Sequence, residues 1–557
     1  MNGTPLEKVR QHFKELKDER SSWESKWRDC RDYIEPNRGR RLDGSGASEV
    51  NNGRKRDTKR VNETATRALN ILANGMQSGL TSKARQWFLL TNPDPELNKY
   101  KPVREWYDKV QEILEDIFRA SNIYSSFLHV YKEMALFGQG AILLRSHPDK
   151  ILHTQAFTTG TYYMSTNEWG EVDTFFQNEW LTARQIVLAY GEENVPSYVL
   201  DAYRNGKQEE RFEVVNGFLA HPEQYGVKVP GQQKVASVHF LAKSAQGVGD
   251  TFLRVSGYYS FPVMTPRWDV VDRDVYGMSP TDDVICDVKM LQSMDTDAFK
   301  AVCKSVNPPM RIPPELERRG LNVNPNALNV VSSMNEHAIA PLYTVPINIQ
   351  QLQMKIQAVE QNIKDGYYNS LFLALLTQDN PQMTAREVAE RHEEKLLMLG
   401  PVLERIHYEL LDPVLDRTFN IAWDAGLIPP PPKELEGQPT RIEYVSILSQ
   451  AQKAVGVNRI EQGLSFIANM ATIYPEVRHI LDPYKTVSKY CGMIGTSAEI
   501  FRSENDYQKA VATEQKQMQQ AQQLEAANSM ANSAKVIGDT DMTNVRELLA
   551  SNGLALG

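Results

Sequence analysis

Two stretches of the chain contain residue types that could support hydrolytic chemistry. His392-Glu-Glu-Lys begins like the two-histidine motif that binds catalytic zinc, but Leu396 stands where the second ligand would be. His407 lies too far along the same predicted helix to share a metal ion with His392. Ser279 follows Gly277-Met, but the final glycine of a nucleophile elbow is absent. We therefore predict surface or interface histidines and a helix-capping serine rather than catalytic residues.

Acidic clusters and phosphate-binding loops give no stronger indication of catalysis. Asp282, Asp283 and Asp287 are close together on one predicted helix and resemble a metal-binding cluster, but their helical spacing favours a solvated acidic face. The glycine-rich loop that holds nucleotide phosphates, Gly-x-x-x-x-Gly-Lys-Ser/Thr, does not occur in the chain. We predict no cofactor, no metal and no enzymatic activity. A hydrolase built from carboxylates and histidines in the strand region stays open as an alternative.

The composition is that of a folded, water-soluble protein with several domains. The chain has 557 residues, of which 41% are hydrophobic and 24% charged. No segment approaches the roughly 18 continuous apolar residues of a membrane helix, so no membrane partner is expected. The net charge is −8, whereas a protein that binds nucleic acid through its phosphates usually carries a basic surface. Any DNA is therefore expected to pass by rather than to be held.

The chain begins with a clear helix pattern. Thr4, Pro5 and Glu7 have the spacing of a capping box, and an apolar stripe follows at helical spacing. Arg20 interrupts this stripe, and Pro36 ends it. A stripe of this length indicates a helix that packs along an equally long partner.

A basic loop follows the first helix. Residues 37–60 mix glycine, serine and asparagine with arginine and lysine, including Arg54, Lys55 and Arg56. Two interpretations stay open: a solvated flexible loop, or a loop that contacts nucleic acid or an acidic neighbouring subunit. Helical patterns resume at 62–79, 101–120 and 122–137.

Between about 140 and 275 the hydrophobic period shifts towards two. This period is typical of strands, and turn residues separate the segments. The predicted strands are 141–145, 151–157, 162–165, 172–178, 212–218 and 235–242. Short helical patterns near 182–190 and 197–204 interrupt them. We predict an antiparallel sheet here and an α+β, predominantly α-helical fold for the whole chain.

Two long helices flank a proline-rich insertion in the next region. The first starts at Ser279 and the second near Pro346, and each runs for about 26 residues, or roughly 40 Å. Asp295 intrudes on the apolar stripe of the first helix, which favours a subunit interface over a dry core. Val359 lies on the stripe of the second helix.

A polar loop and a very long helix complete the pattern. The polar segment 378–382 interrupts the helical pattern, because Pro381 cannot continue a helix. The long helix then begins near Thr384 and ends by Gly426, with expected kinks at Gly400-Pro401 and Pro413. Residues 440–500 read as mostly helical. From 506 to about 535 the composition turns to glutamine and alanine, which indicates disorder or a helix packed on copies of itself.

The order of these parts resembles the portal family, in particular the head-to-tail connecting proteins of short-tailed bacteriophages. The residues that carry the resemblance are Pro266-Arg-Trp268, Tyr276-Gly-Met-Ser-Pro280, Met383-Thr-Ala-Arg-Glu-Val388 with Arg391 and Glu394, Leu399-Gly-Pro-Val402, Glu409-Leu-Leu-Asp-Pro413 and Ile447-Leu-Ser-Gln-Ala-Gln-Lys453. No single motif is strong, but their order is specific. The resemblance is weakest in 37–60 and after about 505.

The resemblance implies a dodecameric ring at one capsid vertex, built from wing, stem, clip and crown. Carried onto this chain, the parts are 1–278 wing, 279–306 first stem helix, 307–346 clip, 347–374 second stem helix, 375–384 tunnel loop, 385–505 long kinked helix of wing and crown, and 506–557 crown or barrel helix or flexible tail. It further implies that double-stranded DNA is packaged through the ring into the procapsid and later ejected. The implied partners are the terminase large subunit, head-tail adaptor and tail proteins, and the major capsid and scaffolding proteins. The implied location is the virion, after assembly in the host cytoplasm.

By position, the tunnel loop would place four side chains towards passing DNA. Gln378, Asp379, Asn380 and Gln382 are uncharged or acidic, so they would keep contacts with phosphates weak, whereas a ring of lysines would hold them. The alternative function is an internal scaffold or core protein of the virion without a DNA channel. It would fit the glutamine-rich tail but leave the sheet and the insertion unexplained.

Overall fold

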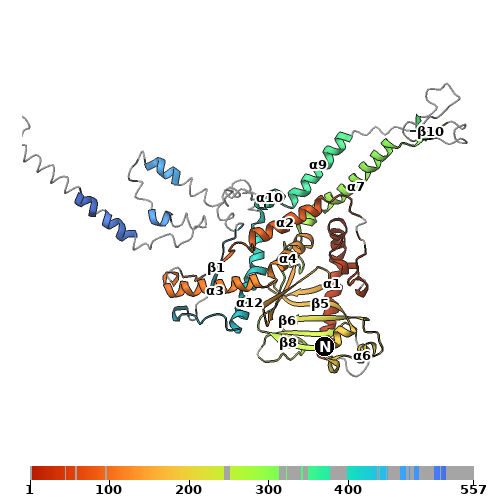
Figure 1. The fold of residues 1–557 in the computed structure, drawn as a ribbon, viewed down its shortest axis with the longest axis horizontal. Coiled ribbons are helices and arrows are strands. Elements are labelled where there is room, and N and C mark those ends of the chain that lie inside the picture. Colours follow the sequence, from red (N-terminus) through yellow and green to blue (C-terminus); the bar gives the residue numbers. More distant parts are fainter. Residues whose placement is uncertain are drawn as a thin grey trace, which may run out of the picture. The chain divides into compact units, whose positions relative to one another are not determined.

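The computed structural model describes residues 3–43, 46–54, 56, 59–94, 97–231, 233–243, 251–312, 322, 340–342, 349–376, 398–435, 437, 440–446, 448, 464–471, 474, 476, 482–487, 507–514 and 516–521. The chain divides into two compact units, Met1–Gln452 and Lys453–Gly557. Helices and antiparallel sheets make up the first unit (Figure 1). This confirms the predicted α+β, predominantly α-helical fold class. In the part of the chain covered by these ranges, no helix has the length and apolar character needed to cross a bilayer.

Helix α1 (Pro5–Ile34) begins as predicted, with Thr4 and Glu7 closing the capping box. Its apolar stripe packs on the largest sheet, in a core formed by Leu6, Val9, Phe13, Leu16, Phe176, Val215, Val238 and Phe240. Arg20 does not break this contact, because it is itself buried. Its guanidinium donates a hydrogen bond of 2.7 Å to the carbonyl of Tyr162. A long polar side chain thus satisfies its donors inside the core.

The predicted strand region forms two antiparallel sheets, ordered β4-β5-β6-β7-β8 and β3-β2-β9. The strands are β2 (Ala141–His147), β3 (Ile151–Phe157), β4 (Tyr162–Thr166), β5 (Val172–Thr182), β6 (Arg211–Leu219), β7 (Val235–Leu241), β8 (Arg254–Tyr258) and β9 (Val263–Met264). All six predicted strands are therefore present. The two predicted short helices are α5 (Ala183–Tyr190) and α6 (Ser197–Arg204), which pack together against one face of the larger sheet.

Helices α2 (Thr64–Leu80), α3 (Lys101–Ala120) and α4 (Ile123–Phe137) match the three predicted helical patterns. Strand β1 (Phe88–Thr91) pairs antiparallel with β12 (Arg441–Tyr444), which comes from a segment far away in the sequence. The helical prediction for 440–500 is therefore wrong at its beginning. This strand pairing ties the end of the first unit to its helical body.

Helices α7 (Pro280–Val306) and α9 (Ile349–Gly366) lie side by side and extend from the body of the first unit (Figure 1). We call this pair the rod. Beyond the end of α7, strand β10 (Met310–Arg311) pairs antiparallel with β11 (Ala340–Pro341). At the other end α7 begins at the predicted cap, where the Ser279 hydroxyl accepts from the amide of the third helical residue.

The second helix of the rod is shorter than predicted. It ends at Gly366, and α10 (Asn369–Leu376) begins after a turn. Tyr368 lies in this turn with a φ of 54°, a conformation that side chains other than glycine rarely adopt. The helix ends at a glycine, but the positive-φ position itself is occupied by tyrosine, so the residue type there does not mark the turn.

Residues 398–406 are helical, and the helix continues through a π-helical turn at His407–Leu411 into α12 (Asp412–Asp424). This turn immediately precedes Pro413, where a kink was predicted. The Asp412 amide donates to the carbonyl of His407, five residues earlier, and Pro413 lies in the first turn of α12, where a proline does not end the helix. In the second unit, residues 464–471, 483–487, 507–514 and 516–521 are helical.

Candidate functional site

The base of the rod is held by polar contacts to other helices. The Thr281 hydroxyl donates to the carbonyl of Ala135 on α4 at 2.8 Å and lies 2.7 Å from the hydroxyl of Tyr367. Asp282 forms an ion pair of 2.9 Å with Lys26 of α1, and its side chain is only 10% exposed. Asp282 is therefore a largely buried cap and ion-pair partner, which corrects the solvated acidic face suggested by its spacing.

A second set of contacts fixes the middle of α7. The side-chain oxygen of Gln292 accepts hydrogen bonds from the backbone amides of Val61 and Asn62 at 2.6 and 2.7 Å. The Asn62 amide group in turn donates to Asp295 at 2.7 Å and to Glu360 of α9 at 3.2 Å. Asp295 thus has a partner inside its own chain, so it gives no support to the predicted subunit interface. It belongs to the contacts that anchor the rod.

The inner half of the rod is closely packed. At Gly366 an added Cβ would lie 2.2 Å from Cγ1 of Val284, a distance that no side chain can occupy, so glycine allows the two helices to approach. The buried apolar residues of this half are Val284, Val288, Leu291, Val359 and Ile363. These contacts make the inner half part of the core of the first unit.

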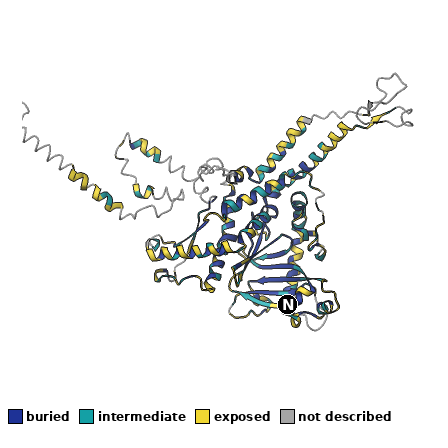
Figure 2. Ribbon diagram, viewed as in Figure 1, coloured by how far each residue is buried: buried dark blue, intermediate teal, exposed yellow. Residues whose placement is uncertain are grey.

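The outer half of the rod differs, because most of its described residues are exposed (Figure 2), and several of these are apolar. On α7, the side chains of Phe299, Val302 and Val306 are 69%, 46% and 71% exposed. On α9, Met354 is 68% exposed. At helical spacing, the α7 residues continue the stripe that is buried further in. A contiguous uncovered stripe of this kind is typical of a surface that packs against another chain.

Basic residues of the loop at 37–60 mostly have partners within the chain. Arg56 forms an ion pair with Glu49, and both side chains are less than a tenth exposed. Arg54 is exposed, and its backbone amide donates to the side chain of Asn52. Lys55 lies outside the described residues. Further internal contacts join Arg38 to Glu133, Arg41 to the carbonyl of Asn178, Lys59 to Asp32 and Arg60 to the carbonyl of Ile34. A contact with nucleic acid or a neighbouring subunit stays a prediction for this loop.

The predicted tunnel loop, 375–384, overlaps the end of α10 at its first two residues, and the rest of it lies outside the described residues. This applies to Gln378, Asp379, Asn380 and Gln382, so their orientation towards a channel stays a prediction. The helix that leads into the loop, α10, packs against α2, where the ring of Phe372 lies against Gly75.

A buried ion pair connects the segment before the rod to the helix after it. Arg267 and Glu409 approach to 2.6 Å, with side chains 8% and 14% exposed. Glu409 also accepts the backbone amide of Arg267 at 2.8 Å, and Arg267 donates to the carbonyl of Gly170 at 2.8 Å. Both residues belong to stretches that carry the family resemblance, and their role in the structure is to join distant segments.

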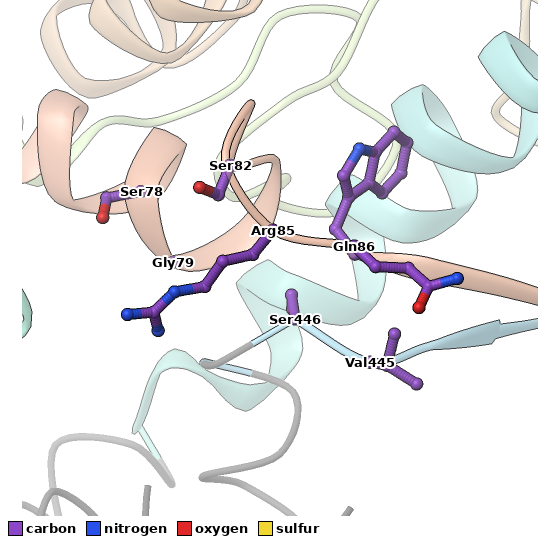
Figure 3. A pocket seen from close by; sticks show the side chains of 8 residues that line it. Ser78, Gly79, Ser82, Arg85, Gln86, Val445 and Ser446 are labelled. Carbon is purple, nitrogen blue, oxygen red and sulfur yellow. The ribbon is translucent and has the colours of Figure 1, made fainter. Parts of the chain in front are cut away.

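The described residues contain no metal-binding cluster. No group of three or more histidine, cysteine, aspartate or glutamate side chains among them could hold a metal ion. A cavity of about 150 Å³ lies at the end of α2. Figure 3 shows Ser78, Ser82 and Arg85 on one side of it and Val445 and Ser446 on the other. Its described lining includes neither a carboxylate nor an imidazole, so these serines have no adjacent base there.

Comparison with known proteins identifies the family. A family model described as the bacteriophage head to tail connecting protein matches residues 6–501. The chain belongs to this family. This head-to-tail connecting protein is 35% identical over 555 residues to the portal protein of Salmonella phage epsilon15. The alignment covers 99% of this chain and 98% of that protein. It is 34% identical over 539 residues to the probable portal protein of Bordetella phage BPP-1, covering 96% and 95%.

Among solved structures, this head-to-tail connecting protein is similar to a chain in the neck of an empty GTA particle, with a TM-score of 0.36 and 12% identity over 78% of this chain and 90% of that chain. A chain in the virion of a native gene transfer agent particle gives a TM-score of 0.33 at 12% identity, with the same coverage. The family match and the two phage relatives confirm the resemblance inferred from the sequence.

The anchoring contacts of the rod were missed by reasoning from the sequence. The signal that could have revealed them is Gln292, a polar residue next to the buried Leu291 in the predicted stripe of α7. A buried amide must find hydrogen-bond partners, and here it finds Val61 and Asn62.

Proposed function

We propose that this chain is a portal protein, whose copies assemble side by side into a closed ring at one vertex of a capsid, with twelve subunits expected from the family resemblance. One observation carries the proposal: the rod is anchored to its own chain at the inner half and exposes apolar side chains at the outer half. A subunit of a closed ring needs two different partner faces, and an uncovered apolar stripe can supply one of them. Near-full-length similarity to two phage portal proteins supports the proposal.

In this proposal the ring is a passage for double-stranded DNA, which is packaged into the procapsid and later ejected. The rod is the stem, residues 307–346 are the clip that docks the terminase large subunit and later the adaptor and tail proteins, and 375–384 form the tunnel loop. The remaining segments form the wing and crown, in contact with capsid and scaffolding proteins. The chain contributes no catalysis of its own. Its net charge of −8 favours a conduit, because a basic channel would bind phosphates and slow the DNA.

Phe299→Asp tests the assembly surface. Because Phe299 is 69% exposed, the change should leave the fold of the single chain intact. In the ring it would place an unpaired charge in an apolar contact, so we expect assembly to require at least about tenfold more protein. Size-exclusion chromatography with light scattering measures the assembly, and far-ultraviolet circular dichroism checks the fold. Phe299→Leu is the control and should assemble as the wild type does. Rings of Phe299→Asp at wild-type concentration would count against this surface.

The tunnel loop is tested by replacing Asp379 and Asn380 together with lysine. We expect rings to form normally but DNA packaging or genome retention to fall, because a ring of lysines binds phosphates. Complementation of a portal-deficient phage, scored as titre and as nuclease-protected DNA, measures the effect. Asp149→Lys, in an exposed turn between β2 and β3, is the control for added positive charge and should preserve the titre. An unchanged titre for the double variant would contradict a loop that faces the channel.

A further inference from the structure

A second cavity, of about 180 Å³, lies between the two sheets and is closed at one side by α5. We call it the inter-sheet pocket. Its lining residues are Arg145, Gln155, Gln177, Glu179, Ala189, Tyr190, Val214, Asn216, His239 and Arg254. Almost all of these residues are polar, although the same face of the larger sheet carries the apolar core formed with α5 and α6.

The strand register explains how one wall of the pocket becomes polar. Gln177 of β5 lies opposite Asn216 of β6, which lies opposite His239 of β7, which lies opposite Arg254 of β8. Directly paired residues point to the same face of a sheet, so these four side chains form a continuous row across four adjacent strands. Gln177 and Asn216 are buried at the floor, whereas Arg254 is exposed at the mouth. The next row on this face is apolar only on β5 and β6, where it contains Phe175 and Phe218, and it continues with Ser237 and Ser256 on β7 and β8.

Two arginines face this pocket without a carboxylate partner. Arg145 enters from β2, and within the described part of the chain its side chain has no ion pair and its buried Nε has no hydrogen-bond partner. Arg254 donates to the carbonyl of Ala189 and lies over the ring of Tyr190, and it too has no ion pair among the described residues. Guanidinium groups in such a position favour planar or tetrahedral oxyanions, to which they donate two hydrogen bonds at once.

The other charges of the pocket leave this positive charge uncompensated. Glu179 accepts hydrogen bonds from the amide groups of Gln177 at 2.6 Å and Gln155 at 3.5 Å, and it contributes the single negative charge. Burial, together with Arg254 and Arg145, lowers the pKa of His239 to about 4, so this imidazole is neutral at physiological pH. Its Nδ1 lies 2.9 Å from the hydroxyl of Tyr190. One positive charge therefore remains in excess among the described lining residues.

We propose that the inter-sheet pocket binds a small oxyanion, either a phosphate or a carboxylate group, held between Arg145 and Arg254. The amide groups of the floor and the Tyr190 hydroxyl supply further polar contacts. The bound anion would neutralise the excess charge and join the two sheets through β2 and β8. This proposal concerns a region away from the rod and does not depend on ring formation.

The test is calorimetric titration of the full-length protein with sodium phosphate and, separately, with sodium acetate, each at an ionic strength held constant with chloride. We expect one saturable site per chain for at least one of the two anions. Saturation by phosphate assigns a phosphate group, and saturation by acetate assigns a carboxylate group; either supports the proposal. Arg145→Gln should weaken the binding by at least about tenfold, because it removes a charged bidentate donor.

Arg184→Gln is the matched control, since Arg184 lies on α5 outside the pocket and forms an exposed ion pair of 3.5 Å with Glu209. It should change the affinity by less than about twofold. If Arg145→Gln does not fold, Arg254→Gln at the exposed mouth takes its place and should weaken binding in the same way. The absence of saturable binding for both anions, or equal affinity in the wild type and the pocket variants, would overturn the proposal.

Discussion

Val359→Asp is expected to destabilise the chain by about 4 kcal/mol or more. Val359 is 5% exposed on α9, which packs against α7 and α2. An aspartate there would lose the apolar contacts of valine and would bury either a charge or a protonated carboxyl group without a partner. Because the damage occurs inside one subunit, rings should fail to accumulate for lack of folded chains. Interface loss is then a secondary effect.

Gln357→Asp provides the control for Val359→Asp. Gln357 is exposed on the same helix, so its replacement should change the free energy of unfolding by less than about 0.5 kcal/mol. Urea denaturation followed by tryptophan fluorescence measures both variants, at a protein concentration that gives them the same assembly state. If Val359→Asp unfolded at the wild-type urea concentration, the inner half of the rod would not be the core described above.

Arg267→Ala is expected to cost about 3–5 kcal/mol, because it leaves Glu409 in a buried position where, among the described residues, the backbone amide of residue 267 is its remaining hydrogen-bond donor. The truncation also removes the hydrogen bond to the carbonyl of Gly170. The expected structural result is looser attachment of the helix at 398–424 to the sheets. Limited proteolysis should then cut near this helix sooner than in the wild type.

Arg405→Ala is the matched control for Arg267→Ala. Arg405 forms an ion pair of 3.1 Å with Asp269, but the side chain of Asp269 is 61% exposed, so the loss should be at most about 1 kcal/mol. The free energies of unfolding of both variants are compared in urea. Equal losses for the two variants would show that the Arg267–Glu409 pair has no special role in joining these segments.

Local signals in the sequence predicted much of the fold. The capping boxes at Thr4 and Ser279 place the starts of α1 and α7, since a hydroxyl followed by an acidic residue at the third helical position satisfies two backbone amides. The strands β2 to β7 follow from alternating hydrophobicity between turn residues. In each case the physical cause lies within a few residues, so it can be seen without knowledge of the tertiary structure.

Features that depend on distant partners could not be predicted. Arg20 reads as a break in a stripe, but its guanidinium reaches a carbonyl more than a hundred residues away. Asp295 reads as an interface residue, but Asn62 satisfies it within the chain. The pairing of β1 with β12 could not be predicted for the same reason, because the two strands are far apart in the sequence. The polar row of the inter-sheet pocket emerges only from the strand register, because its members are far apart in sequence.

In the proposed ring, rods of neighbouring copies pack side by side and cover one another's outer apolar stripe. Single-particle electron microscopy of the purified full-length protein tests this most directly. We expect a closed ring with a central opening, in which Phe299, Val302 and Val306 of each copy are buried against the next. A homogeneous population of monomers with these three side chains exposed, or covered by residues of the same chain, would contradict the claim.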